Sequence, residues 1–108
     1  MNKPLAVLAG ATVALGSVAV PALAGGTSVT VRDNEFAPGK KTIRKGDKIT
    51  FRWRGDALHN VRKVSGPGGT FSSKTQRSGS YVRKFTRKGR YTLVCSIHPG
   101  MDLKVVVK

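Results

Sequence analysis

The 108-residue sequence predicts an all-β protein, a small sandwich or barrel of short strands that follows an N-terminal export signal. Three observations predict this fold class. Apolar and polar residues alternate along several short segments of the chain, turns containing Gly or Pro separate these segments, and no window has a convincing helical period. The first residues differ in composition from the rest and are interpreted separately.

The first 24 residues have the three parts of a secretory signal peptide. Lys3 gives a positively charged start, residues 5–20 form an uncharged apolar run, and Ala22-Leu23-Ala24 is a small-x-small cleavage motif. Pro21 breaks the run just before this motif, which favours cleavage after Ala24. An uncleaved membrane anchor is the alternative, because the run is nearly long enough to span a bilayer.

We therefore expect a signal peptide over residues 1–24 and one domain over residues 25–108, located in the periplasm or outside the cell. Cleavage after residue 24 would leave 84 residues. A domain of this size buries a small core and usually needs a disulfide or a bound metal for stability.

The first half of the domain contains two alternating segments. Residues 28–32 read SVTVR and residues 49–54 read ITFRWR, so every second side chain is apolar in each. This period of two is typical of a strand with one buried face.

The second half contains three more candidate strands. Residues 81–85 (YVRKF) place aromatic rings at both ends of one face, residues 91–95 (YTLVC) put Tyr, Leu and Cys on a shared face, and residues 103–107 (LKVVV) close the chain. Turn signals lie between the strands, and we expect the Gly-rich residues 65–69 to form the most mobile loop.

Cys95 is the only cysteine, so no disulfide can form within the chain. Cys95, His98 and Met101 follow the pattern Cys-x-x-His-x-x-Met, and His59 lies 36 positions upstream of Cys95. A thiolate, two imidazoles and a weak thioether contact suit copper in both oxidation states. Zinc is the competing metal, although it gains little from Met and usually needs a fourth strong ligand. Taken singly, a Cys or Met at such a position is more often core packing than a ligand, and a lone His such as His59 is more often a hydrogen-bonded polar residue.

This segment resembles a known family. Residues 89–101 (GRYTLVCSIHPGM) resemble the C-terminal copper loop of plastocyanins and amicyanins, which belong to the cupredoxins. His59-Asn60 followed by Val61 resembles the upstream ligand motif of these proteins. Phe36, Pro38, Ile43 and Gly46-Asp47 resemble the N-terminal half. The short spacing from His98 to Met101 is closer to amicyanin than to plastocyanin.

The resemblance implies a Greek-key β-sandwich with one copper ion at one end, held by His59, Cys95, His98 and Met101. It also implies that Asn60 joins the two ligand loops by hydrogen bonds, that His98 lies nearest the surface, and that the protein carries single electrons without being an enzyme. A copper carrier or storage protein without redox turnover is the alternative function. The chain is shorter and more basic than is usual in this family.

The chain carries 20 Lys and Arg against 5 Asp and Glu, a formal charge of +15. The predicted leader contains Lys3 and no other charged residue, so cleavage would leave +14. Such a charge favours anionic partners. We expect a monomer that meets a redox protein with an acidic docking surface, or an anionic membrane or cell-wall surface. We expect an apolar surface around His98, formed by Pro38, Leu58, Pro99 and Met101.

Specific nucleic-acid binding is a weaker interpretation of the charge, because the basic residues alternate with apolar ones and are expected on solvated strand faces. They are Arg52, Arg54, Arg62, Lys63, Arg83, Lys84, Arg87, Lys88 and Arg90. Catalysis has little support, since no paired carboxylates have a plausible spacing.

Overall fold

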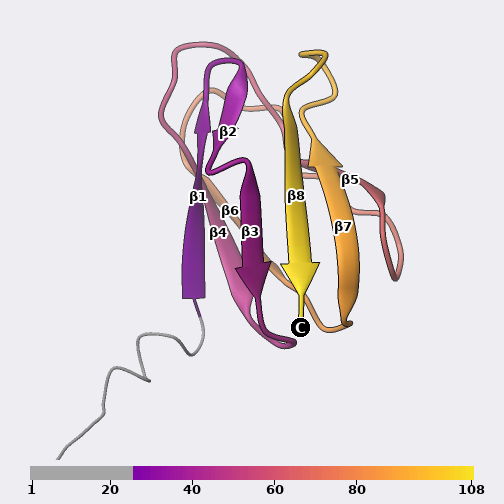
Figure 1. Cartoon of the computed structure of the whole chain (residues 1–108). Coiled ribbons are helices and arrows are strands. Elements are labelled where there is room, and N and C mark those ends of the chain that lie inside the picture. Colours follow the sequence, from indigo (N-terminus) through magenta and orange to yellow (C-terminus); the bar gives the residue numbers. More distant parts are fainter. Residues whose placement is uncertain (1–25) are drawn as a thin grey trace, which may run out of the picture.

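The computed structural model describes residues 26–108, which form two four-stranded sheets packed as a sandwich (Figure 1). The first sheet has the order β2-β1-β4-β6, with strands β1 (Gly26–Arg32), β2 (Glu35–Ala37), β4 (Lys48–Trp53) and β6 (Ser80–Lys84). The second has the order β3-β8-β7-β5, with strands β3 (Lys40–Ile43), β5 (Arg62–Ser65), β7 (Gly89–Val94) and β8 (Asp102–Val107). The predicted all-β class is confirmed, as a sandwich. The signal peptide predicted over residues 1–24 lies outside the described residues.

The five predicted strands agree with β1, β4, β6, β7 and β8 to within one or two residues. The sequence did not reveal β2, β3 and β5, because each has only three or four residues and too few apolar side chains to show alternation. Within residues 26–108, no helix is long and apolar enough to cross a membrane.

The core lies between the two sheets and consists of the inward-facing side chains of alternating positions. Val29, Phe51 and Leu93 are fully buried, and Trp53 and Leu103 are also buried. Burial of each large apolar side chain contributes ~1.5–3 kcal/mol relative to its exposure. The two-residue periodicity of the sequence therefore sets which face of each strand points inward.

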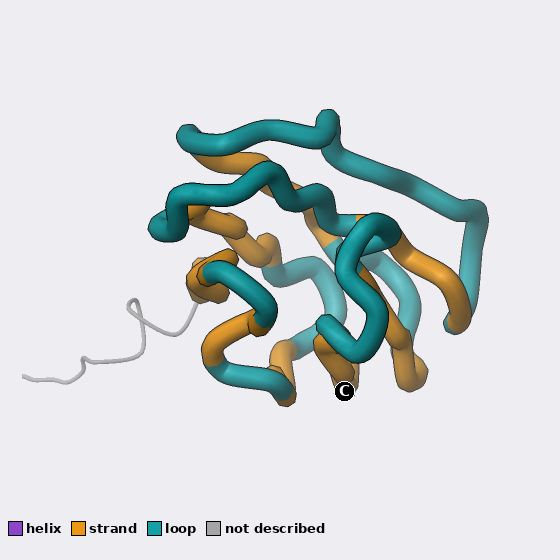
Figure 2. Tube along the Cα trace, turned by 90° about the horizontal axis from the view of Figure 1, so that it is seen from above, coloured by secondary structure: helices purple, strands orange, loops and turns teal. Residues whose placement is uncertain are grey.

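Strand direction brings three connections to one end of the sandwich. β1 and β4 are parallel, with Val31 opposite Trp53, so both strands end on the same side. The β1–β2 turn and residues 54–61 lie there, beside residues 95–101, which connect β7 to β8 (Figure 1). We call this the site end; Figure 2 looks down on it, with loops nearest the viewer.

One predicted surface residue is buried instead. Lys63 in β5 was expected on a solvated strand face, but only 2% of it is exposed. Its ammonium donates to the backbone carbonyls of Pro67, Gly68 and Gly69, and it lies 5.5 Å from the centre of the Tyr91 ring. The prediction was wrong because Lys63 takes an inward position of β5, where loop carbonyls replace water around the charge.

Candidate metal centre

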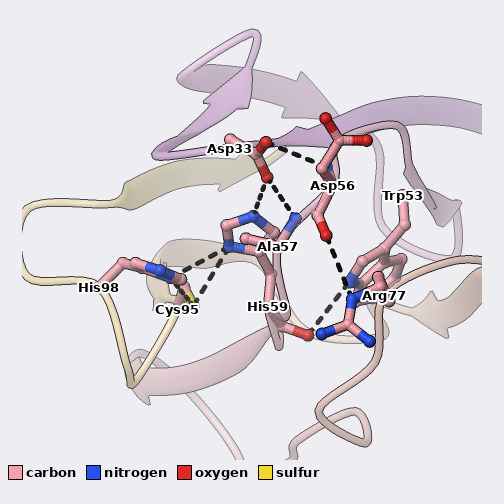
Figure 3. A network of polar contacts seen from close by, with 8 residues as sticks. All are labelled: Asp33, Trp53, Asp56, Ala57, His59, Arg77, Cys95 and His98. Carbon is pink, nitrogen blue, oxygen red and sulfur yellow. Dashed lines mark hydrogen bonds and ion pairs between the residues drawn. The ribbon is translucent and has the colours of Figure 1, made fainter.

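Three potential ligand atoms meet at the site end, from two segments far apart in the sequence (Figure 3). Nδ1 of His59 and Nδ1 of His98 are 3.1 Å apart. Sγ of Cys95 lies 3.4 Å from Nδ1 of His98 and 3.9 Å from Nδ1 of His59. All three atoms lie within 4.8 Å of one another, which is close enough for a single metal ion to contact them all.

The Cys-x-x-His-x-x-Met spacing produces a compact loop. Cys95 directly follows β7, and its carbonyl accepts a hydrogen bond from the backbone N–H of His98 at 3.3 Å. The N–H of Met101 donates to the His98 carbonyl at 3.2 Å, and the N–H of Cys95 donates to the Met101 carbonyl at 3.0 Å. Gly100 has φ of 84°, a conformation that favours glycine. The backbone therefore holds all three side chains of the motif on one short loop.

Met101 is 2% exposed, so it does not belong to the apolar surface around His98 where we expected it. Met101 starts the inward-facing series that continues in β8 with Leu103 and Val105, all of them buried. Pro38, Leu58 and Pro99 are exposed as expected, and Ile97, which was not among the expected residues, is 49% exposed. We call Leu58, Ile97 and Pro99 the apolar patch.

Hydrogen bonds with Gln76 and Trp53 hold the backbone of His59 in place. Its N–H donates to the carbonyl of Gln76 and its carbonyl accepts from the N–H of Gln76, both at 3.0 Å. The indole Nε1 of Trp53 also donates to the His59 carbonyl at 3.0 Å. A buried tryptophan at the end of β4 thus anchors the histidine that follows it.

Asn60 links the two ligand segments directly. Its Nδ2 donates to the hydroxyl of Ser96 at 2.8 Å, and the backbone N–H of Ser96 donates back to its Oδ1 at 2.8 Å. Asn60 is buried, so water competes little for these bonds. The reciprocal pair holds residues 59–60 against residues 95–96.

Asp33, in the β1–β2 turn, is a site residue that the sequence argument missed. Its Oδ1 lies 2.8 Å from Nε2 of His59 and accepts the backbone N–H of Ala57 at 3.0 Å, and its Oδ2 accepts the N–H of Asp56 at 3.0 Å (Figure 3). The bond from Asp56 contributes most, followed by those from His59 and Ala57, to lowering the pKa of Asp33 to about 2. In the sequence, Asp33 beside Asn34 indicates only a turn, and nothing there predicts a contact with His59.

The site is closed on one side and reaches the surface on the other. His59 is 1% exposed and Cys95 3%, whereas His98 is half-buried. His98 is therefore the member of this cluster closest to solvent, beside the exposed Ile97 and Pro99.

The donor set fits copper better than zinc. Two imidazole nitrogens and one thiol make three strong donors, and no carboxylate belongs to this cluster of described residues. Thiolate favours Cu(I) and imidazole accepts Cu(II), whereas a structural zinc site usually needs four strong ligands.

Comparisons with known proteins agree with this chemistry. Residues 25–108 match the family described as copper binding proteins, plastocyanin/azurin family. The chain is 32% identical over 105 residues to amicyanin-alpha of Methylorubrum extorquens, covering 91% of this chain and 88% of that protein. A reduced Cu(I) form of an amicyanin variant superposes with a TM-score of 0.69 at 28% identity, covering 78% of this chain and 83% of the other.

A copper-containing nitrite reductase from Thermus scotoductus SA-01 shares the fold alone. Its identity is 23% and its TM-score 0.69, and the match covers 77% of this chain but only 22% of the reductase. With the family match over the whole described domain, the chain belongs to the copper-binding plastocyanin/azurin family, the cupredoxins, and its cofactor is copper.

Proposed function

We propose that this protein is an exported carrier of single electrons rather than an enzyme, with one copper ion bound by His59, Cys95, His98 and Met101. The observation that carries the proposal is the convergence of two imidazole Nδ1 atoms and one thiol within 4.8 Å in a largely buried place. Copper bound there supplies a one-electron couple between Cu(I) and Cu(II).

The surrounding residues support electron transfer by keeping the site rigid. The hydrogen bonds within residues 95–101 and the Asn60–Ser96 pair hold both ligand segments in place. Ligands that the protein holds rigidly move little when the bound ion changes oxidation state, so electron transfer requires little rearrangement of the site. The burial of His59 and Cys95 also keeps water and other ligands away.

His98 is the proposed exit for the electron, because it is the only member of the cluster that is half-buried. The apolar patch beside it can exclude water when a partner binds. The exposed side chains of Arg54 and Lys74 add positive charge to the surface near His59. We propose that this protein acts as a monomer and that its partner is a redox protein with an acidic docking surface.

A copper carrier or storage protein is the competing function. A carrier needs a labile, accessible site so that the ion can be handed over. The nearly complete burial of His59 and Cys95 counts against this, since both would need to move before copper could leave.

The visible absorption spectrum of the copper-loaded, oxidised protein tests the proposal. We expect a strong blue colour from thiolate-to-copper charge transfer, and we expect Cys95→Ser to abolish it along with most of the copper affinity. Cyclic voltammetry should then give a reversible one-electron wave. A wild-type protein that binds copper and stays colourless would contradict the proposed site, and a blue protein without reversible reduction would favour the carrier.

A further inference from the structure

Asp33 lies in an exposed turn, yet its side chain contacts residues outside that turn. The turn lies between β1 and β2, which are paired through Arg32 and Glu35, and the Asp33 side chain is 39% exposed. Its carboxylate nevertheless points across the site end, where it accepts two backbone N–H groups and lies 2.8 Å from the ring of His59 (Figure 3).

The chain also leaves room for this carboxylate. A Cβ on Gly55 would lie 2.3 Å from Oδ1 of Asp33 and 2.9 Å from its backbone nitrogen, closer than atoms can approach. Residue 55 therefore has to be glycine if Asp33 is to reach its three donors. Residues 55–59 are thus shaped around the two carboxylate oxygens of Asp33.

The contact determines which nitrogen of His59 carries the proton. An ionised carboxylate only accepts hydrogen bonds, so Nε2 of His59 must be the donor. The neutral ring then has its lone pair on Nδ1, the atom that faces Sγ of Cys95 and Nδ1 of His98. A ring in the other tautomer would present an N–H to the metal site.

We propose that Asp33 is a positioning residue that holds His59 in the tautomer ready for copper and keeps the reduction potential of the site low. This inference rests on the proposed ligand role of His59. A carboxylate bonded to the far nitrogen makes an imidazole a stronger donor, and a stronger donor together with a nearby negative charge stabilises Cu(II) relative to Cu(I).

The experiment compares Asp33→Asn with Asp56→Asn. The first removes the charge and, because an amide has one acceptor oxygen, leaves at least one of the three donors without a partner. The second removes the same charge from the neighbouring segment after β4, although the Asp56 side chain does not contact His59; only its backbone N–H takes part. Asp33→Glu, which keeps the carboxylate, tests for partial rescue.

Two measurements are made on each variant. The reduction potential of the copper-loaded protein should rise in Asp33→Asn by a tenfold shift of the Cu(I)/Cu(II) equilibrium, ~59 mV for one electron, and change little in Asp56→Asn. Nitrogen-15 NMR of the metal-free protein should show the His59 ring protonated at Nε2 in the wild type, with mixed tautomers in Asp33→Asn.

Equal potential shifts in the two variants would overturn the proposal, because they would reflect charge alone. An unchanged tautomer and potential in Asp33→Asn would overturn it as well. If Asp33→Asn does not fold, Gly55→Ala displaces the same carboxylate without removing its charge, and wild-type behaviour of that variant would contradict the proposal. A wild-type protein without a blue copper band would refute the proposed function instead, while NMR of the metal-free protein still tests the role of Asp33.

Discussion

At the scale of single residues, the site depends on contacts at both nitrogens of one imidazole. Nδ1 of His59 faces Cys95 and His98, and Nε2 faces Asp33. The contacts at Nδ1 were expected from the sequence, because His59, Cys95 and His98 match the ligand motifs of the cupredoxins. The contact at Nε2 joins residues 26 positions apart through a turn whose sequence suggests nothing but a turn.

Met101 should adjust the copper site rather than create it, because a thioether is a weak axial ligand. We expect Met101→Gln to retain copper and its colour but to have a lower reduction potential, since a harder oxygen donor favours Cu(II). Copper titration and voltammetry measure the two effects separately. Complete loss of copper from this variant would mean that Met101 is a primary ligand.

At the scale of elements, β5 and the loop after it depend on one buried cation. Lys63 bonds to three consecutive carbonyls of residues 67–69, which belong to the segment that the sequence predicts to be the most mobile. Gly66 and Gly68 have positive φ values of 118° and 83°, which lets the backbone turn these carbonyls toward the ammonium. The loop is therefore tied to the sheet through the side chain of a strand.

We expect Lys63→Met to destabilise the fold by ~2 kcal/mol, because it keeps the volume but removes the charge-assisted hydrogen bonds from the buried ammonium to the three loop carbonyls. For a domain of this size, this corresponds to a fall of roughly 8–16 °C in the melting temperature. The neighbouring Arg62→Met, at an exposed position of the same strand, should change little. Equal melting temperatures for the two variants would show that the Lys63 bonds contribute nothing net. The colour of the copper-loaded protein should persist in both.

At the scale of the whole molecule, copper should stabilise the fold, because the ligand atoms come together only in the native state. Binding to the native state alone adds ~4 kcal/mol at a thousandfold excess over the dissociation constant. Thermal melts with and without copper measure this, and Cys95→Ser is the control that should respond weakly. A wild-type midpoint that does not move with copper would argue against a preformed site.

Charge is distributed unevenly between the two ends of the sandwich. Hydrogen bonds join residues 43–47, Phe85 and Lys108 at the end opposite the site. This far end carries one acidic residue, Asp47, and seven basic ones, Arg44, Lys45, Lys48, Lys84, Arg87, Lys88 and Lys108. The acidic Asp33, Glu35, Asp56 and Asp102 lie at or beside the site end, together with the basic Arg32, Arg54 and Arg77. A six-residue strand such as β4 separates the ends by about 20 Å, more than two Debye lengths at physiological ionic strength.

Electron transfer to an acidic redox partner should therefore depend on the basic residues near the site rather than on the total charge. We expect the double variant Arg54→Gln with Lys74→Gln to transfer several-fold more slowly at low salt and to show a weaker salt dependence. Lys45→Gln with Lys88→Gln removes the same charge at the far end and should have a much smaller effect. Stopped-flow rates across ionic strength measure both, and equal effects would point to non-specific attraction instead of docking.

The sequence by itself determined the all-β class, the five long strands, the copper chemistry and the convergence of Cys95 with His98. Those features depend on short-range periodicity, turn residues and a motif contained in seven positions. Only the tertiary structure decided that Lys63 points inward, that Met101 is buried and that Asp33 reaches His59. The physical reason is that burial and hydrogen bonding depend on how the folded chain is arranged. Asp33 and Met101 meet residues distant in the sequence only in the native sandwich. The partners of Lys63 are close in the sequence, but their carbonyls surround its ammonium only in the folded loop.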